Sequence, residues 1–95
     1  MANERVIQRD FLIEEADRFA VHGNEALQVF VDRLPQKDIL TVPEVTAALD
    51  LRNSNTVIAW CDSGELPYFN SSTGGKVYRK IPRKSVVALL KSRIH

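Results

Sequence analysis

Apolar residues recur every three or four positions in several parts of the chain, the spacing that places them on one face of an α-helix. The pattern is clearest over residues 24–34, at Ala26, Leu27, Phe30, Val31 and Leu34. Pro35 ends this predicted helix because it lacks a backbone N–H and restricts the residue before it. Residues 4–20 show a less regular pattern, which indicates a helix but leaves residues 11–13 open to a short strand.

A short helix is predicted to start after Thr41. Thr41 and Glu44 have the spacing of a capping box, in which the hydroxyl accepts from the Glu44 N–H and the carboxylate accepts from the Thr41 N–H. Pro43 falls in the first turn, where a missing N–H does no harm. The helix is expected to end near Asp50, with Val42, Val45 and Leu49 on its inner face.

A second short helix follows, capped by either Asn53 or Ser54 and running to about Ser63. Gly64 is a typical residue for its C-terminal stop. The predicted inward stripe consists of Val57, Trp60 and Cys61. Two short helices joined by a tight polar turn predict a helix-turn-helix.

Residues 66–69 and 76–81 are rich in aromatic and β-branched side chains and flank six turn-forming residues, which predicts a β-hairpin with a long, mobile tip. Alternation along the second strand puts Lys76, Tyr78 and Lys80 on one face and Val77, Arg79 and Ile81 on the other. Three aromatic residues, Tyr68, Phe69 and Tyr78, are expected to pack the hairpin onto the domain.

A last helix is predicted from Pro82. Its inward positions are Val86, Leu89, Leu90 and Ile94, and its outward positions are Lys84, Lys91 and Arg93. Arg83 and Lys84 would oppose the dipole at the start of this helix, which predicts that an external phosphate offsets their charge.

Charge is divided between the two halves of the chain, although the net charge is only +1. Residues 1–50 carry five basic and ten acidic residues, and residues 51–95 carry eight basic and two acidic residues. The halves therefore differ, at −5 and +6, and no acidic residue follows Glu65. This segregation favours a polyanion on one face of the molecule and a different partner on the other.

Length and composition exclude several classes of protein. Ninety-five residues, 44% of them hydrophobic and 26% charged, predict one small globular domain. The chain has one cysteine and no apolar run of membrane-spanning length, and no secretion signal is predicted, so a cytoplasmic location is expected. His22 and His95 are far apart in sequence, and no nucleophile, base and oxyanion donor come together. We therefore predict no enzyme activity, small-molecule substrate, cofactor or metal site.

In order and spacing, these elements resemble the excisionase/MerR-type winged helix-turn-helix family. The resemblance spans residues 39–90 and rests on Leu40-Thr41-x-x-Glu44, Leu49-x-Leu51, Thr56-Val57-x-x-Trp60, Gly64-Glu65-Leu66-Pro67 and Lys80-Ile81-Pro82-Arg83. It implies a mainly α fold with a small β-hairpin, and a small DNA-binding protein of the kind found among phage and transposon excisionases, MerR-type regulators and phage packaging subunits.

The resemblance divides the chain into an acidic helical extension, residues 1–37, and a winged helix-turn-helix domain, residues 38–95. It implies a recognition helix in the major groove of double-stranded DNA and a basic wing on an adjacent minor groove or its phosphates. The residues expected to contact DNA are polar or basic and lie at the start of the second helix or around the wing. They are Arg52, Asn53, Ser54, Asn55, Thr56, Lys76, Arg79, Lys80, Arg83 and Lys84.

The recognition helix departs from the family pattern. Ser54 and Ala59 stand where members usually carry Arg or another long polar residue, and Asp50 replaces the usual turn glycine. An alternative function is therefore a protein-interaction module that keeps the fold but has lost base-specific reading. Residues 1–37 are open to three uses: covering the domain, forming a homodimer or binding a partner protein. Excision, transcriptional control and packaging are equally open.

Overall fold

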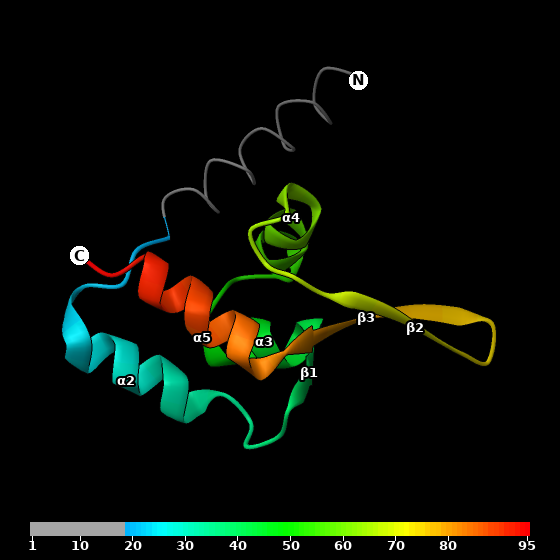
Figure 1. Ribbon diagram of the computed structural model, residues 1–95, viewed down its shortest axis with the longest axis horizontal. Coiled ribbons are helices and arrows are strands. Elements are labelled where there is room, and N and C mark those ends of the chain that lie inside the picture. The colour runs from blue at the N-terminus through cyan, green and yellow to red at the C-terminus, as the bar shows by residue number, and fades with distance from the viewer. Residues whose placement is uncertain (1–18) are drawn as a thin grey trace.

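The computed structural model describes residues 19–95, so the prediction for residues 4–18 lies outside the described part; Phe19 and Ala20 have no regular secondary structure. The elements are α2 (Gly23–Arg33), β1 (Ile39–Thr41), α3 (Val42–Ala48), α4 (Asn55–Ser63), β2 (Phe69–Thr73), β3 (Lys76–Pro82) and α5 (Arg83–Ser92). Figure 1 shows the helices gathered at one end and the β2–β3 hairpin projecting from them. The arrangement is that of a winged helix-turn-helix, as predicted.

The predicted capping box at the start of α3 is confirmed. The Thr41 hydroxyl accepts from the Glu44 N–H at 3.3 Å, and the Glu44 carboxylate accepts from the Thr41 N–H at 3.0 Å. Lys37 adds an ion pair, with its Nζ 2.9 Å from the same carboxylate. These contacts satisfy N–H groups that have no partner within the helix and fix where α3 begins.

The turn between α3 and α4 depends on Asp50, whose φ of 55° is the only positive value outside glycine in the described chain. This left-handed conformation lets the Leu51 N–H donate back to the Thr46 carbonyl at 3.1 Å and close the end of α3. Aspartate tolerates the conformation better than most side chains. Asn53 then accepts from the Asn55 N–H at 2.9 Å, so Asn53, and not Ser54, provides the side-chain cap of α4.

The β-structure is larger than predicted. β1 adds a third strand, and the antiparallel order is β1-β3-β2, with Leu40 opposite Ile81 and Phe69 opposite Lys80. The expected long tip is wrong: the strands pair to Thr73 and Lys76, leaving a two-residue turn. Gly74 and Gly75 have φ values of 60° and 80°, as a tight hairpin turn of this twist requires.

One core joins all the helices to the base of the sheet. Trp60 is completely buried, together with Val45 and Val57 of the helix-turn-helix, Leu40 and Ile81 of the sheet, and Leu90 of α5. Phe19 packs edge-on against Trp60, with ring centroids 5.3 Å apart. Burial of the predicted stripe of α4 is thus confirmed.

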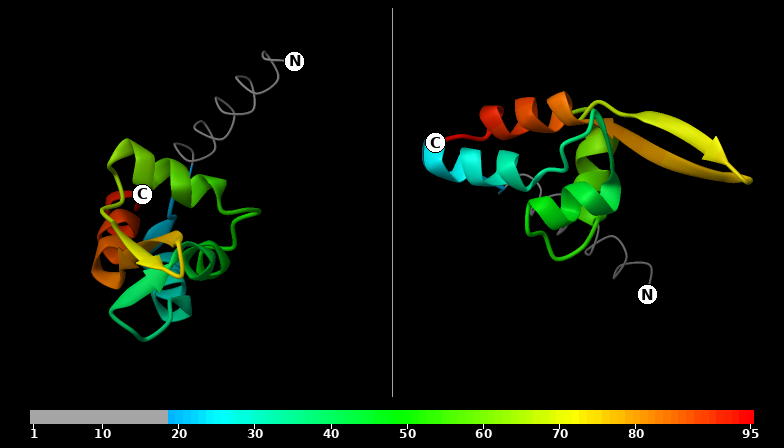
Figure 2. Two further views of the ribbon diagram at one scale, coloured as in Figure 1. Left: turned by 90° about the vertical axis from the view of Figure 1, so that its right-hand side faces the viewer. Right: turned by 90° about the horizontal axis from the view of Figure 1, so that it is seen from below.

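Helix α2 lies beside α5 and runs in the opposite direction (Figures 1 and 2). Leu27, Phe30 and Val31 of α2 pack against the core, and Leu34, the residue that caps the end of the helix, is buried in it. Of the three uses open to the N-terminal extension, this helix therefore serves the first, covering the domain. Just before α2, Val21 forms a parallel bridge with Ile94 that ties the two ends of the described chain together.

Two orientation predictions are wrong. Phe69 and Tyr78 do not pack the hairpin onto the domain, because 47% and 45% of their surfaces are exposed; only Tyr68 packs against the core. Arg93 does not face solvent: its side chain is 15% exposed, and its guanidinium lies 2.7 Å from Glu65 and over the Trp60 ring. The hairpin extends past the domain, so its aromatic residues have nothing to cover them (Figure 2).

Candidate nucleic-acid interface

The start of α4 presents a compact group of polar side chains. Arg52, Asn53 and Asn55 are exposed there, and Ser54 is half-buried with its hydroxyl 3.4 Å from that of Thr46. Thr56 is 2% exposed, so the expectation that it lies on the surface is wrong. Its side chain falls on the same side of the helix as Trp60, one turn further on, and is drawn into the core with it.

The outward face of α4 carries no positive charge of its own. Asp62 and Ser63 are exposed, and Ile58 and Ala59 are half-buried. Within the described part of the chain, the basic side chain that pairs with this face comes from another element and is Arg79 of β3. Any phosphate contact beside α4 must therefore come from the turn before it or from the wing.

Arg79 fastens the hairpin to α4. Its Nη1 lies 3.0 Å from an Asp62 carboxylate oxygen and donates to the Ile58 carbonyl at 3.3 Å. The guanidinium also stacks over the Tyr68 ring, 5.3 Å from its centroid. Because these contacts come from the hairpin's base, they hold the wing at a set angle to the recognition helix. Asp62, whose charge would repel phosphate, is neutralised by the same pair.

The two faces of the hairpin carry different residues, and the predicted alternation is confirmed. Arg79 and Ile81 turn toward the helix-turn-helix and the core. Lys80 shares the opposite face with Tyr78, and its Nζ lies 5.8 Å from that ring. Lys76 is exposed at the hairpin's end, next to the two-residue turn.

Arg83 has a different role from the one predicted. Its guanidinium donates to the carbonyls of Val31 at 2.9 Å and Pro35 at 3.2 Å, at the C-terminal end of α2. Val31 lies in the last turn of α2, at the negative end of the helix dipole, and Pro35 follows just after the helix. Each carbonyl also accepts one backbone N–H, from Leu34 and Lys37 respectively, so Arg83 adds a second donor to both. The expected external phosphate is therefore not needed for Arg83: the charge that opposes the start of α5 stabilises the end of α2.

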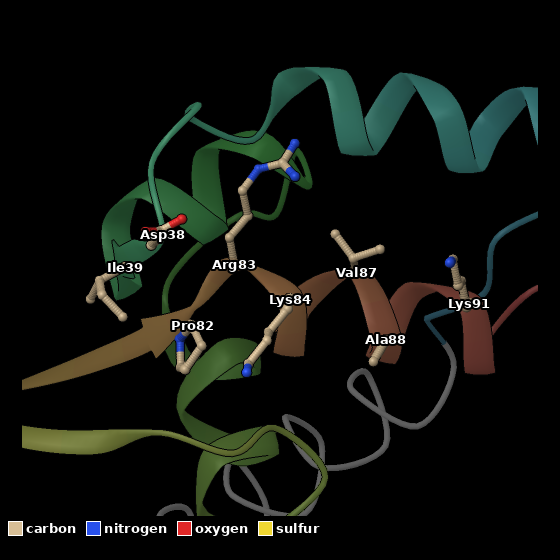
Figure 3. Close-up of a pocket in the computed structure, with 8 residues that line it drawn as sticks. All are labelled: Asp38, Ile39, Pro82, Arg83, Lys84, Val87, Ala88 and Lys91. Carbon is tan, nitrogen blue, oxygen red and sulfur yellow. The ribbon is translucent and has the colours of Figure 1, made fainter.

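Lys84 is exposed and points away from Arg83, as Figure 3 shows. The ten residues predicted to contact DNA therefore do not form one surface. Arg52, Asn53, Asn55, Lys76 and Arg79 lie around α4 and the wing, and Lys80 and Lys84 lie on the other face of the sheet and on α5. The alternation of side chains along β3 predicted that Arg79 and Lys80 lie on opposite faces of the sheet. No short-range pattern in the sequence predicted that Arg83 contacts the end of α2, because the two are far apart along the chain.

The described chain has two further features that bear on reactivity or metal binding, the Cys61 thiol and a pair of histidines. Burial raises the pKa of the Cys61 thiol, while nearby Arg79 acts in the opposite direction, so the thiol is buried and protonated. The rings of His22 and His95 lie 5.9 Å apart, a proximity that the sequence did not predict. Among residues 19–95 no third ligand joins them to make a metal cluster.

None of the helices in the described region, which starts at Phe19, has the length and apolar character needed to cross a membrane. Comparison with curated proteins and with solved structures gives no match. A family model described as a helix-turn-helix domain matches residues 39–94, which include both helices of the motif, the three-stranded sheet and α5.

This match covers more than half of the chain and coincides with the motif, turn and wing seen in the structure. Helix-turn-helix domains place their second helix in the major groove, so the match indicates DNA binding as the general function. The chain belongs to the helix-turn-helix domain family, of the excisionase-like kind.

Proposed function

We propose that the protein is a small accessory DNA-binding factor, excisionase-like or regulatory, that places α4 in the major groove and the hairpin on adjacent phosphates. Arg52, Asn53 and Asn55 would meet the groove edge, since Asn can bond adenine by two contacts and Arg can bind guanine or phosphate. Lys76 and Arg79 would meet the backbone beside the wing. Residues 38–95 would form the DNA-binding unit and residues 1–37 its extension.

The observation that carries the proposal is the junction between Arg79 and Asp62, at 3.0 Å. It holds the hairpin and α4 in one orientation before any DNA is bound. A binder that keeps its two contact elements in place loses less conformational entropy on association. The same junction leaves Arg52 and Lys76 exposed at separate ends of the surface, where each can reach a different phosphate.

The proposal is tested by fluorescence anisotropy with a short random-sequence DNA duplex at low salt. We expect Arg52→Gln and Lys76→Gln each to weaken binding about tenfold, because each removes one phosphate contact. Arg33→Gln is the matched control: it removes the same charge from an exposed position on α2, away from the wing. No binding at micromolar protein, or equal losses for all three variants, would contradict the proposal.

A second candidate function is protein binding on the same fold. It is favoured by α4 itself, which has no basic residue and exposes Asp62. The double variant Arg52→Glu/Lys76→Glu separates the two, because it abolishes DNA affinity under the first proposal and leaves a protein partner bound under the second. Substitution of Arg79 or Arg83 would not separate them, since both side chains make internal contacts.

Neither candidate function by itself says whether the protein serves in excision, transcriptional control or packaging. We infer that the protein acts by occupying DNA and has no enzymatic activity, in line with its family, and a cytoplasmic location stays a prediction. Excision, transcriptional control and packaging all use the same contacts, so the DNA sequence that the protein selects from a random pool is the observation that distinguishes them. A site beside a recombination end, a promoter or a packaging start would each identify one role.

A further inference from the structure

The face of the molecule opposite Arg79 carries an open groove of about 840 Å³ between β1 and α5. Its floor is apolar, made by Ile39, Pro82, Val87 and Ala88, and Lys84 and Lys91 border it (Figure 3). Ile39 is 38% exposed, high for a large apolar residue in a strand. A smaller hollow of about 480 Å³ lies on the far side of Lys84 and Ala88, so this part of α5 forms a ridge between two depressions. We call this surface the α5 groove.

The α5 groove continues onto the sheet. Ile39 pairs with Pro82, and Lys80 pairs with Phe69 in the next row, so Ile39, Lys80 and Phe69 share one face. Exposed Tyr78 lies further along that face. Arg79 and its contact with α4 lie on the other face, so the α5 groove would stay open while α4 and the wing bind DNA.

The lysines of the α5 groove are not neutralised internally. Among residues 19–95, no carboxylate forms an ion pair with Lys84 or Lys91, and the ion pairs present there use Lys37, Arg79 and Arg93 instead. One acidic residue, Asp38, lies at the β1 end of the groove. Apolar surface bordered by unpaired cations fits an acidic segment that also carries apolar side chains.

The chain itself contains a segment of this chemistry. Residues 10–17 hold four acidic residues and no basic one, interleaved with Phe11, Leu12, Ile13 and Ala16. As a helix, the 14 residues from 4 to 17 would span roughly 21 Å, against roughly 15 Å for the ten residues of α5. Over the whole of residues 4–17 there are five acidic and two basic residues, so the net charge of the segment is opposite to that of the lysines at the α5 groove. Its apolar content and its length also suit the groove.

We propose that the α5 groove receives residues 4–17 of a second copy of the chain, and that two copies exchange these segments to form a dimer. Phe19 makes docking in trans more favourable than docking in cis. Its ring packs against Phe30 of α2 and Trp60 of α4. The described chain therefore begins against the core, whereas the α5 groove opens between β1 and α5. Reciprocal exchange gives both copies the same contact and closes the assembly at two.

In this proposal the partner of the N-terminal extension is a second copy of the chain. The dimer does not depend on the proposed DNA contacts, because it uses a different face of the molecule. Sedimentation velocity of the full chain without DNA tests it. We expect a concentration-dependent dimer that Lys84→Glu/Lys91→Glu and Glu14→Lys/Glu15→Lys each weaken by at least about tenfold, because each variant sets like charges against one another. Both lysines are exposed, and no carboxylate between residues 19 and 95 pairs with either of them. Circular dichroism checks that the fold is kept.

The decisive sample is an equimolar mixture of the two variants. Each would then meet the opposite charge in its partner, in both contacts, so dimerisation should return to within about threefold of the wild type. Arg33→Glu, a single reversal outside the groove, should leave dimerisation unchanged where Lys84→Glu weakens it. A monomeric wild type would overturn the proposal, as would a dimer that the reversals do not affect or a mixture that stays monomeric.

Discussion

Glu44 stabilises the start of α3 through contacts made close by in the sequence. Its carboxylate accepts from the Thr41 N–H and hydroxyl, both at 3.0 Å, and pairs with Lys37 at 2.9 Å. The hydrogen bond from Lys37, followed by the one from the Thr41 N–H, lowers the pKa of Glu44 from its ordinary value of 4.5. The ionised form is therefore the one that the folded state prefers.

This lowered pKa predicts a specific pH dependence of stability. A carboxyl with a depressed folded pKa contributes stability above its unfolded value, here about 4.5, and loses that contribution as pH falls through the folded pKa. Glu44→Gln keeps an oxygen for the Thr41 N–H but removes the charge. We expect urea unfolding to show a loss of about 0.5 kcal/mol at pH 7 that disappears in acid. A loss independent of pH would show that the charge is unimportant.

The turn between α3 and α4 sets how the two helices of the motif cross. Asp50 closes the end of α3 in a left-handed conformation, with φ of 55°, at the position where the family usually has glycine. That departure was visible in the sequence, and the structure shows that the backbone still takes the conformation glycine would allow. The substitution therefore changes the energy of the turn and not its path.

Substitutions at Asp50 should change stability in opposite directions. Asp50→Gly should raise the free energy of unfolding by about 0.5 kcal/mol, because relief of left-handed strain slightly exceeds the added entropy of the unfolded chain. Asp50→Val should lower it by about 1–2 kcal/mol, since a β-branched residue fits this conformation poorly. Both are read from urea unfolding curves. Equal destabilisation by the two would mean that the Asp50 side chain, and not its backbone, stabilises the turn.

The molecule as a whole separates its positive charge onto two faces. Arg52, Lys76 and Arg79 surround α4 and the wing, and Lys80, Lys84 and Lys91 surround the α5 groove. Arg83 and Arg93 are used internally, against the end of α2 and against Glu65. The +6 charge of the C-terminal half is thus not one DNA-binding patch.

This separation predicts a shallow salt dependence of DNA binding. Three phosphate contacts give a slope of about −2.7 for log affinity against log salt, or about a 40-fold loss between 50 and 200 mM. The five cations Lys76, Arg79, Lys80, Arg83 and Lys84 acting together would instead give a slope of about −4.5. A titration at several salt concentrations distinguishes the two, and the steeper slope would place Lys80, Arg83 and Lys84 on DNA.

Most of the fold could be predicted because it follows from short-range patterns. The capping box, the burial of Trp60, the left-handed Gly64 and the alternation along β3 all depend on residues within a few positions of one another. The third strand was missed because β1 pairs with residues far along the chain, Leu40 with Ile81. The two-residue turn was missed because pairing with the neighbouring strand β3 adds hydrogen bonds that place residues 70–73, whose own propensity is for turns, in β2.

For the candidate site, the sequence by itself determined which residues are charged and which helix is the recognition helix. Both follow from residue type and from the order of the elements, which do not depend on tertiary packing. Only the tertiary structure decided which groups each of these side chains contacts. Arg83 reaches carbonyls 48 and 52 positions away, Arg79 reaches α4, and Thr56 goes into the core. An arginine takes whichever acceptors the fold brings within reach, and those acceptors come from elements far apart along the chain.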